Sequence, residues 1–312
     1  MDKKRGFAYE LKKNKGLFLL MLPGVLYLFI NNYVPMFGIV IAFKQIRTYG
    51  KNIFETYFNN PWVGFKNFEF FLKTQDAFII TRNTVLYNVV FIFLGLVLSV
   101  SCAIALNEVL NARLAKFYQS SMILPNFLSW IVISAIVYAF LTDKGFINSA
   151  LLAPLGVEPK NFYFDQIYWP FILTAVQLWV NLGVGSVIYL ASITGINGEY
   201  LEAATIDGAT KWQQITKVTL PLLKPTIITM TIISLGGIFS ANFGLFFNVP
   251  RESGILFSVT NVIDTYVFRA LRTGGNTEMA AAAGFYQAIV GFVVVVISNG
   301  VIRKTSRENS LF

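Results

Sequence analysis

Residues 199–225 have the sequence EYLEAATIDGATKWQQITKVTLPLLKP and lie between two long apolar runs. Their pattern is Glu202-Ala203-Ala204, three further residues, Gly208, nine further residues and then Val218-Thr219-Leu220-Pro221. A charged segment of small, helix-favouring residues is unusual between two runs that are apolar enough to cross a membrane. We infer that this stretch is presented to a partner protein.

The first half of the stretch predicts a short helix that ends in a tight turn. Ala203 and Ala204 favour helix, and Glu202 lies in the first turn, where negative charge complements the helix dipole. Asp207 and Gly208 form a turn signal, because Gly accepts the left-handed conformation that ends many helices. The small side chains let another protein approach closely, and the carboxylate suits a basic partner.

The second half predicts another short helix, from Thr210 to Val218, after which Pro221 and Pro225 redirect the chain into the next apolar run. A helix, a tight turn and a second helix on one membrane face suit a rigid coupling lever. The alternative is an Ala-rich amphipathic hairpin that rests on lipid headgroups.

The composition of the whole chain is that of a membrane protein. Its 312 residues are 55% hydrophobic and 13% charged, against about 25% charged in an average soluble domain. Because a charge at the bilayer centre costs about 2.5 to 3.5 kcal/mol, spans are sought as charge-free intervals of about 20 residues or more. The sequence predicts one all-α transmembrane domain over residues 1–312, with six spans at about 17–43, 83–107, 117–142, 167–194, 225–248 and 279–302.

Several classes of function are excluded by residues that the sequence lacks. There is no His, and Cys102 is the only Cys, which excludes internal disulfides and His- or Cys-based metal centres. No phosphate-binding Gly-x-x-x-x-Gly-Lys-Ser/Thr loop occurs. We therefore expect no metal, no cofactor and no enzymatic activity in this chain, and any ATP and Mg²⁺ must be bound by another subunit. The net charge of +9 is scattered between apolar runs rather than gathered in a patch, so we expect no nucleic-acid partner.

The distribution of Lys and Arg predicts the orientation. Six basic residues precede the first span, which resembles a signal peptide, but the apolar run is too long and lacks a small-residue cleavage site. With both termini in the cytoplasm, the inner segments hold more Lys and Arg than the outer ones, as the positive-inside rule requires. The chain is expected to be a multi-pass protein of the plasma membrane, with residues 199–224 as a cytoplasmic loop.

Two of the outer loops contain groups that suggest contacts. Residues 61–65, with the sequence PWVGF, suit a membrane-interface anchor or, alternatively, a ligand contact. Residues Asp264, Tyr266, Arg269 and Arg272 recur at helical spacing. They predict a short extracellular helix whose charged face meets either a docking protein or solvent.

Polar residues recur on one face of the fourth span. Gln177, Asn181 and Gly185 are spaced at i, i+4 and i+8. Amide groups facing lipid are costly, so this face is expected to line a cavity or contact another helix.

A similar face is predicted in the fifth span, where Phe239, Asn242 and Phe246 recur at i, i+3 and i+7. Trp130 belongs to a weaker face of the third span. Aromatic rings and amides suit the passage of a sugar, which makes Gln177, Asn181, Phe239, Asn242 and Trp130 candidate substrate-pathway residues. Hydrogen bonds between helices are the alternative role for the amides.

The pattern in residues 199–225 is similar to the EAA loop of binding-protein-dependent ABC importer permeases, with Val218 where the family usually has Ile. At average residue frequencies such a pattern has a chance probability of roughly 10⁻⁷ per window. The resemblance implies that the loop fits a cleft on an ATPase subunit. The residues expected to couple to the ATPase are Glu202, Ala203, Ala204, Asp207, Gly208, Leu220 and Pro221.

The resemblance also implies an assembly: a second, homologous permease subunit, two copies of a cytoplasmic ATPase, an extracellular solute-binding protein and the surrounding lipid bilayer. The segments NYVPMFG (32–38), PWVGF (61–65) and VIDTYV (262–267) look like the carbohydrate branch, and are similar to permeases for oligosaccharides or polysaccharide fragments.

The expected substrate is therefore a carbohydrate, specifically an oligosaccharide. One alternative is a permease of the same family for a solute that is not a sugar. Another is a secondary transporter driven by an ion gradient, although the absence of ionisable residues from the predicted spans argues against proton coupling.

Overall fold

The computed structural model describes residues 12–47, 58–69, 73–274 and 277–305, together with Tyr9 and Glu55. Throughout these residues the regular structure is helical, apart from one isolated antiparallel bridge between Lys44 and Trp62. The predicted all-α membrane fold is confirmed. Most of the basic segment before the first span, and the residues after Thr305, lie outside the described residues.

Within the described residues, five helical segments are long and apolar enough to cross a membrane: Lys15–Phe43, Gln75–Asn107, Gln166–Thr194, Lys211–Gly236 and Thr277–Lys304. A sixth span is formed if the bent pair Ala112–Phe127 and Trp130–Leu141 is counted as one. The prediction of six spans agrees with the structure when the bent pair is counted as one span, whereas the courses of the third and fifth spans differ from the prediction.

The spans comprise α2 (Lys15–Leu28), η1 (Phe29–Tyr33), α3 (Val34–Met36) and η2 (Phe37–Phe43); α6 (Gln75–Asn107); α7 (Ala112–Ile123), η4 (Leu124–Phe127) and α8 (Trp130–Leu141); η7 (Gln166–Tyr168) and α9 (Trp169–Thr194); α11 (Lys211–Gln214), η8 (Ile215–Thr219) and α12 (Leu220–Gly236); and α16 (Thr277–Thr305). The connections hold η3 (Gly64–Phe68), η5 (Ile147–Leu152), η6 (Ala153–Leu155), α10 (Glu199–Ile206), α13 (Phe243–Asn248), η9 (Gly254–Leu256), α14 (Phe257–Thr260) and α15 (Ile263–Gly274).

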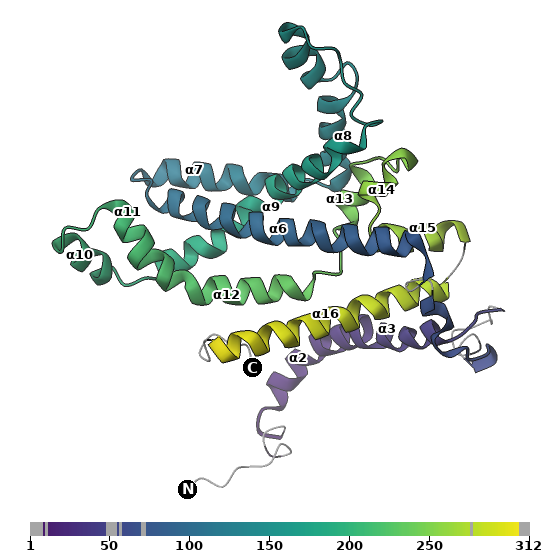
Figure 1. Cartoon of the computed structure of the whole chain (residues 1–312). Helices are drawn as coiled ribbons and strands as arrows, with labels where there is room; N and C mark the ends of the chain where they lie inside the picture. Colours follow the sequence, from purple (N-terminus) through teal and green to yellow (C-terminus); the bar gives the residue numbers. More distant parts are fainter. Residues whose placement is uncertain are drawn as a thin grey trace.

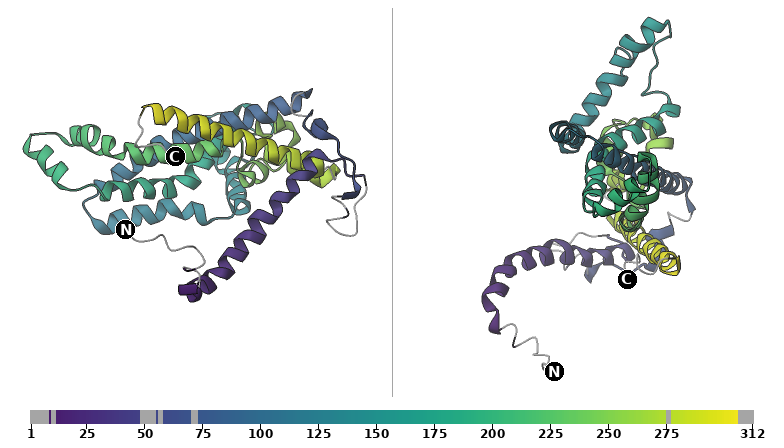
Figure 2. Two further views of the ribbon diagram at one scale, coloured as in Figure 1. Left: turned by 90° about the horizontal axis from the view of Figure 1, so that it is seen from below. Right: turned by 90° about the vertical axis from the view of Figure 1, so that its left-hand side faces the viewer.

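Helices α6, α7, α9 and α12 run side by side and form the body of the protein (Figure 1). The α10–α11 hairpin lies at one end of this bundle, and α13, α14 and α15 gather at the other. Helix α16 and the first span form a second layer, from which α2 diverges (Figures 1 and 2). The hairpin and the α13–α15 cluster therefore lie at opposite ends of the bundle, and the spans connect them.

Small residues let the central helices approach one another closely. The most extensive contact is between α6 and α9, where Ala103 is completely buried in a cluster with Val100, Tyr189 and Ile193. A Cβ placed on Gly183 of α9 would lie 2.1 Å from the carbonyl oxygen of Met122. Because lipid tails are as apolar as the side chains, packing of this kind holds membrane helices together.

A large apolar cluster packs the end of the bundle opposite the hairpin. It centres on Trp169 and Leu173 of α9 and takes in Ile133 of α8 and Leu245 of α13. The indole nitrogen of Trp169 donates to the carbonyl oxygen of Phe162 at 2.7 Å, so the buried ring leaves no polar atom unpaired. This cluster buries α13 beside the spans rather than leaving it in a surface loop.

The third predicted span, over 117–142, is not one straight helix in the structure. The chain bends by 101° between Phe127 and Trp130. Pro125 lies in the 3₁₀ turn η4, and Ser129 caps the next helix by accepting from the N–H of Val132 at 3.3 Å. The cap supplies a partner for the freed backbone group and so stabilises the bend. Helix α8 consequently projects away from the bundle (Figure 1).

The prediction of a fifth span over 225–248 is also wrong at both ends. A continuous helical segment begins at Lys211, passes through Pro221 and Pro225 and ends at Gly236. Pro221 lies in the first turn of α12, directly after the π-helical turn η8. A proline in that position and a widened turn are both compatible with a continuous helix, so the two prolines do not redirect the chain.

The aromatic loop motif PWVGF is anchored by rings. Phe43 stacks on Trp62 at 5.7 Å and meets Phe65 edge-on at 5.5 Å. Phe43 also contacts Phe285 of α16 at 5.3 Å. The rings tie this loop to the first span and to α16, and the membrane-interface role that the sequence suggests stays a prediction.

The contact at Gly183 leads to a stability prediction. Gly183→Ala should destabilise the protein by about 1 to 3 kcal/mol, because the new methyl group meets backbone atoms of α7 that cannot rotate away. Gly284→Ala in α16 is the matched control, since its Cβ meets nothing within 4 Å. Thermal unfolding of the purified protein in detergent measures both, and equal midpoints for the two variants would contradict the close helix contact.

Candidate coupling surface and polar groove

The α10–α11 hairpin has the local structure that its sequence predicts. Helix α10 carries Glu202 in its first turn, and Gly208 follows with φ of +75°. A side chain is strained in that left-handed conformation, so glycine suits the turn. Thr210 and Gln213 then form a reciprocal capping box at the start of α11, with hydrogen bonds of 2.8 and 3.3 Å.

A buried glutamine makes the hairpin one rigid unit. The Gln214 amide donates to the hydroxyl of Thr205 on α10 at 3.0 Å and to the carbonyl oxygen of Ala209 in the turn at 3.3 Å. Since α11 is continuous with α12 up to Gly236, the hairpin and α12 form one continuous helical path. The sequence analysis did not single out Gln214.

The outer side of the hairpin presents both apolar and acidic groups. Ile206 is 86% exposed and Trp212 is 72% exposed, and Glu202, Ala203 and Asp207 are also exposed. Exposed apolar side chains beside carboxylates form a surface of the kind that a protein partner can bury.

The remaining residues of the predicted coupling set lie differently. Ala204 is half-buried. Leu220 packs beside the cluster that contains Leu223, and Pro221 lies in the first turn of α12. Leu220 and Pro221 thus belong to the start of α12 rather than to the exposed surface of the α10–α11 hairpin.

A polar groove of about 330 Å³ lies between α6, α9 and α12. Its hydrogen-bonding side chains are Asn88 and Ser99 from α6, Gln177, Asn181 and Tyr189 from α9, and Thr231 and Ser234 from α12. Gly185 also lines it, so the face predicted in the fourth span does meet a cavity. All of the lining residues are uncharged.

The structure brings two predicted pathway residues together. Asn242 donates its side-chain amide to the side-chain oxygen of Gln177 at 3.3 Å, and its own oxygen accepts from the N–H of Leu245 and so caps α13. The Asn181 amide donates to the carbonyl oxygen of Gln177 at 2.9 Å. Asn242 therefore does not line the groove itself, but it bonds to Gln177, which does.

The predicted aromatic face of the fifth span is wrong, because the helix ends at Gly236, before any of its residues. Phe239 contacts Tyr286 of α16 at 6.0 Å. Phe246 is buried against Tyr87 at 4.9 Å. Trp130 packs so closely on Gly244 that a Cβ there would lie 2.1 Å from its ring. Phe239 and Trp130 are both absent from the lining of the polar groove.

Sequence reasoning missed the polar groups that α6 and α12 contribute. Asn88, Gly95 and Ser99 of α6 all line the groove. Their offsets of seven and four residues place them on one helix face, a spacing that was available in the sequence. The contribution of α12 was hidden because Thr231 and Ser234 are common in apolar helices, where they bond the preceding turn, as both do here.

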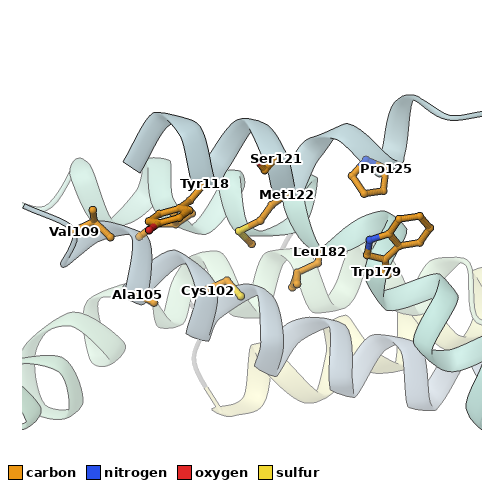
Figure 3. A pocket seen from close by; sticks show the side chains of 10 residues that line it. Cys102, Ala105, Val109, Tyr118, Ser121, Met122, Pro125, Trp179 and Leu182 are labelled. Atoms are coloured by element: carbon orange, nitrogen blue, oxygen red, sulfur yellow. The ribbon is translucent and has the colours of Figure 1, made fainter. Parts of the chain in front are cut away.

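A second cavity, of about 520 Å³, lies between α6, α7 and α9 (Figure 3). Cys102, Met122 and Leu182 point into it, with the rings of Tyr118 and Trp179 toward its two ends (Figure 3). Its lining is mainly apolar and offers few hydrogen-bonding groups. A polar solute is therefore better matched by the polar groove.

The family described as "binding-protein-dependent transport system inner membrane component" matches residues 92–307, which is more than half of the chain. The chain belongs to this family. It is a membrane-embedded transport component rather than an enzyme. The matched region contains the α10–α11 hairpin and every residue of the polar groove except Asn88 and Phe91.

Relatives of the family align along nearly the whole chain. Protein LplB of Bacillus subtilis is 30% identical over 96% of this chain and 92% of the relative's own length. The polygalacturonan/rhamnogalacturonan transport system permease protein YteP, also of Bacillus subtilis, is 29% identical over 98% of this chain and 94% of its own length.

Solved structures show the same fold. A chain of a bacterial ABC transporter involved in the import of the acidic polysaccharide alginate superposes with a TM-score of 0.85 and 28% identity, covering 96% of this chain and 98% of that chain. A structure of a bacterial alginate ABC transporter in complex with an alginate pentasaccharide-bound periplasmic protein gives a TM-score of 0.84 at 27% identity.

Asn181 provides a test of the polar groove. Asn181→Leu should lower uptake about fivefold, which corresponds to the loss of one hydrogen bond worth about 1 kcal/mol. Asn31→Leu is the matched control, because Asn31 makes the same bond to the carbonyl oxygen four residues earlier, at 2.9 Å, in the first span. Uptake is measured per assembled complex, and a loss of assembly with Asn181→Leu would instead show a role in helix packing.

Proposed function

We propose that this chain is a permease subunit of an ATP-driven importer that carries an oligosaccharide delivered by an extracellular binding protein. The observation that carries the proposal is the continuous helical segment Lys211–Gly236, which joins the exposed α10–α11 hairpin to the polar groove. A subunit that hydrolyses ATP can act on the groove through this segment.

The hairpin is the contact for the ATPase in this proposal. Glu202, Ala203 and Asp207 lie on its open side with Ile206 and Trp212. Gly208 makes the turn. Ala204 lies half-buried on α10, and Leu220 and Pro221 lie in the first turn of α12, behind the exposed contact surface. ATP and Mg²⁺ are bound by two copies of the ATPase, and a second permease subunit completes the assembly.

The polar groove supports a carbohydrate substrate. Side-chain amides and hydroxyls donate to and accept from sugar hydroxyl groups, and the groove contains both kinds of group. The relatives whose names specify polygalacturonan/rhamnogalacturonan and arabinooligosaccharides agree with this class. Of the predicted pathway residues, Gln177 and Asn181 line the groove, Asn242 bonds to Gln177, and Phe239 and Trp130 lie outside the lining.

An ion-gradient mechanism has less support. Proton-coupled transporters place ionisable side chains within their spans, whereas the residues that line the polar groove are uncharged. A neutral solute other than a sugar remains the second candidate, because amides and hydroxyls also bind such molecules.

The proposed topology is one transmembrane domain over residues 1–312, with the hairpin and both termini in the cytoplasm. The support is the excess of Lys and Arg in the segments on the hairpin's side of the membrane. The α13–α15 end then faces the extracellular binding protein.

The substrate is tested with the complete transporter in proteoliposomes. ATP-dependent uptake of labelled neutral and acidic oligosaccharides is measured in the presence of the binding protein. Uptake of either class supports the proposal, and uptake of a non-sugar solute alone would contradict it.

Coupling through the hairpin is tested at Glu202. Glu202→Ala should reduce ATPase association and uptake about tenfold, equivalent to roughly 1.4 kcal/mol of contact energy. Glu199→Ala is the control, because both carboxylates lie in the first turn of α10 and both complement its dipole. Equal effects of the two variants on association would show helix stabilisation rather than partner contact.

The turn is tested separately at Gly208. Gly208→Pro should abolish uptake, because proline requires φ near −65° and the residue has φ of +75°. Gly198→Pro, at the start of α10 where φ is −56°, is the control that tolerates proline. Uptake and co-purification with the ATPase are both measured, and normal values for Gly208→Pro would exclude a coupling role for the hairpin.

A further inference from the structure

The helical course of the fifth span is interrupted beside the polar groove. Helix α12 ends at Gly236 and α13 begins at Phe243, so residues 237–242 lie outside both helices. In a bilayer, backbone N–H and C=O groups that leave a helix need partners from the protein, because lipid offers none. The partners present here come from three other helices.

The carbonyl groups of the interrupted segment are bound by two amide side chains. Asn88 of α6 donates to the carbonyl oxygens of Ile238 at 3.0 Å and of Ser240 at 3.1 Å. Gln287 of α16 donates to the carbonyl oxygen of Phe239 at 2.7 Å. Three successive carbonyl groups are thus held from two sides.

The third partner is Asp264 of α15. Its carboxylate accepts from the N–H of Ala241 at 2.7 Å and from the Gln287 amide at 3.2 Å. Burial raises the pKa of the Asp264 carboxyl, while these two donors oppose the shift. The side chain expected on a charged outer helix face therefore points inward instead, toward the interruption.

The helix end itself lies against α16. A Cβ placed on Gly291 would lie 2.8 Å from the carbonyl oxygen of Gly236, so the two backbones meet with no side chain between them. The nearest atom to a Cβ on Gly237 is 3.7 Å away. The chain is therefore closely packed against α16 at Gly236, whereas Gly237 makes only an ordinary van der Waals contact.

We propose that residues 238–242 are a fixed pivot for α12, held by Asn88, Asp264 and Gln287 against α6, α15 and α16. When the hairpin moves, the segment Lys211–Gly236 tilts about Gly237, and the movement displaces the part of the groove wall that α12 supplies, at Met230, Thr231 and Ser234. Asp264 and Gln287 are positioning residues that act through the backbone of the pivot, since neither lines the polar groove. This inference rests on the proposed ATP-driven function.

The test uses the complete transporter in proteoliposomes with its binding protein, and measures ATP hydrolysed and sugar transported per assembled complex. Asp264→Leu should raise the number of ATP molecules hydrolysed per sugar about tenfold, because the lever moves without a fixed end. Asp264→Asn should keep at least half of the wild-type uptake, because an oxygen remains to accept from Ala241. Rescue by the conservative variant separates positioning from loss of packing.

Thr265→Val is the matched control on α15. It removes a buried hydroxyl from the adjacent position. Among the described residues, that hydroxyl bonds to Asn261 and Val262, just before α15, and to Arg269 within α15. Its ratio of ATP to sugar should equal that of the wild type. An increase as large as that of Asp264→Leu would overturn the proposal.

Gln287→Leu provides a second variant, in case Asp264→Leu fails to assemble. It removes the bond to Phe239 and should also raise the ratio of ATP to sugar. A wild-type ratio in whichever of these two variants assembles, or failure of both to assemble, would overturn the pivot. Absence of ATP-dependent uptake by the wild-type complex would instead overturn the proposed function.

Discussion

A lipid bilayer offers no hydrogen bonds to a peptide group, and the fold depends on how each departure from regular helix meets this constraint. Between Phe127 and Trp130 the cap from Ser129 allows a bend of 101°. Between α12 and α13 the side chains of Asn88, Asp264 and Gln287 bond the freed backbone. In both irregular segments, polar side chains at the end of the helix form hydrogen bonds with the backbone groups that the helix leaves unbonded.

The same constraint explains why the polar groove and the interruption occur together. Asn88 donates to the backbone of the interrupted segment and also lines the groove. Asn242 ends the interruption, caps α13 and bonds to Gln177. Amide groups that satisfy an unwound segment inevitably make its surroundings polar. A bundle that breaks a span in this way therefore acquires a wall that suits an uncharged polar solute.

The lever between hairpin and groove depends on an equally local feature. Gln214 joins the two short helices of the hairpin, and the π turn Ile215–Thr219 leads without a break into α12, whose first turn contains Pro221. The hairpin was predictable because turn and cap signals act within four residues of one another. The continuity beyond it was not, because a proline stops a helix in water more reliably than in a membrane, where neighbouring groups compensate.

The sequence by itself determined that the chain lies in a membrane, that it is helical and that the α10–α11 hairpin has its observed form, because charge-free length and local turn chemistry do not depend on distant contacts. It also placed Gln177, Asn181 and Gly185 on one face, since helical spacing is regular. Only the tertiary structure decided where the fifth span ends and what Asp264 does. Those outcomes depend on which side chains from α6, α15 and α16 reach the backbone at 237–242, and apolar periodicity carries no information about such partners.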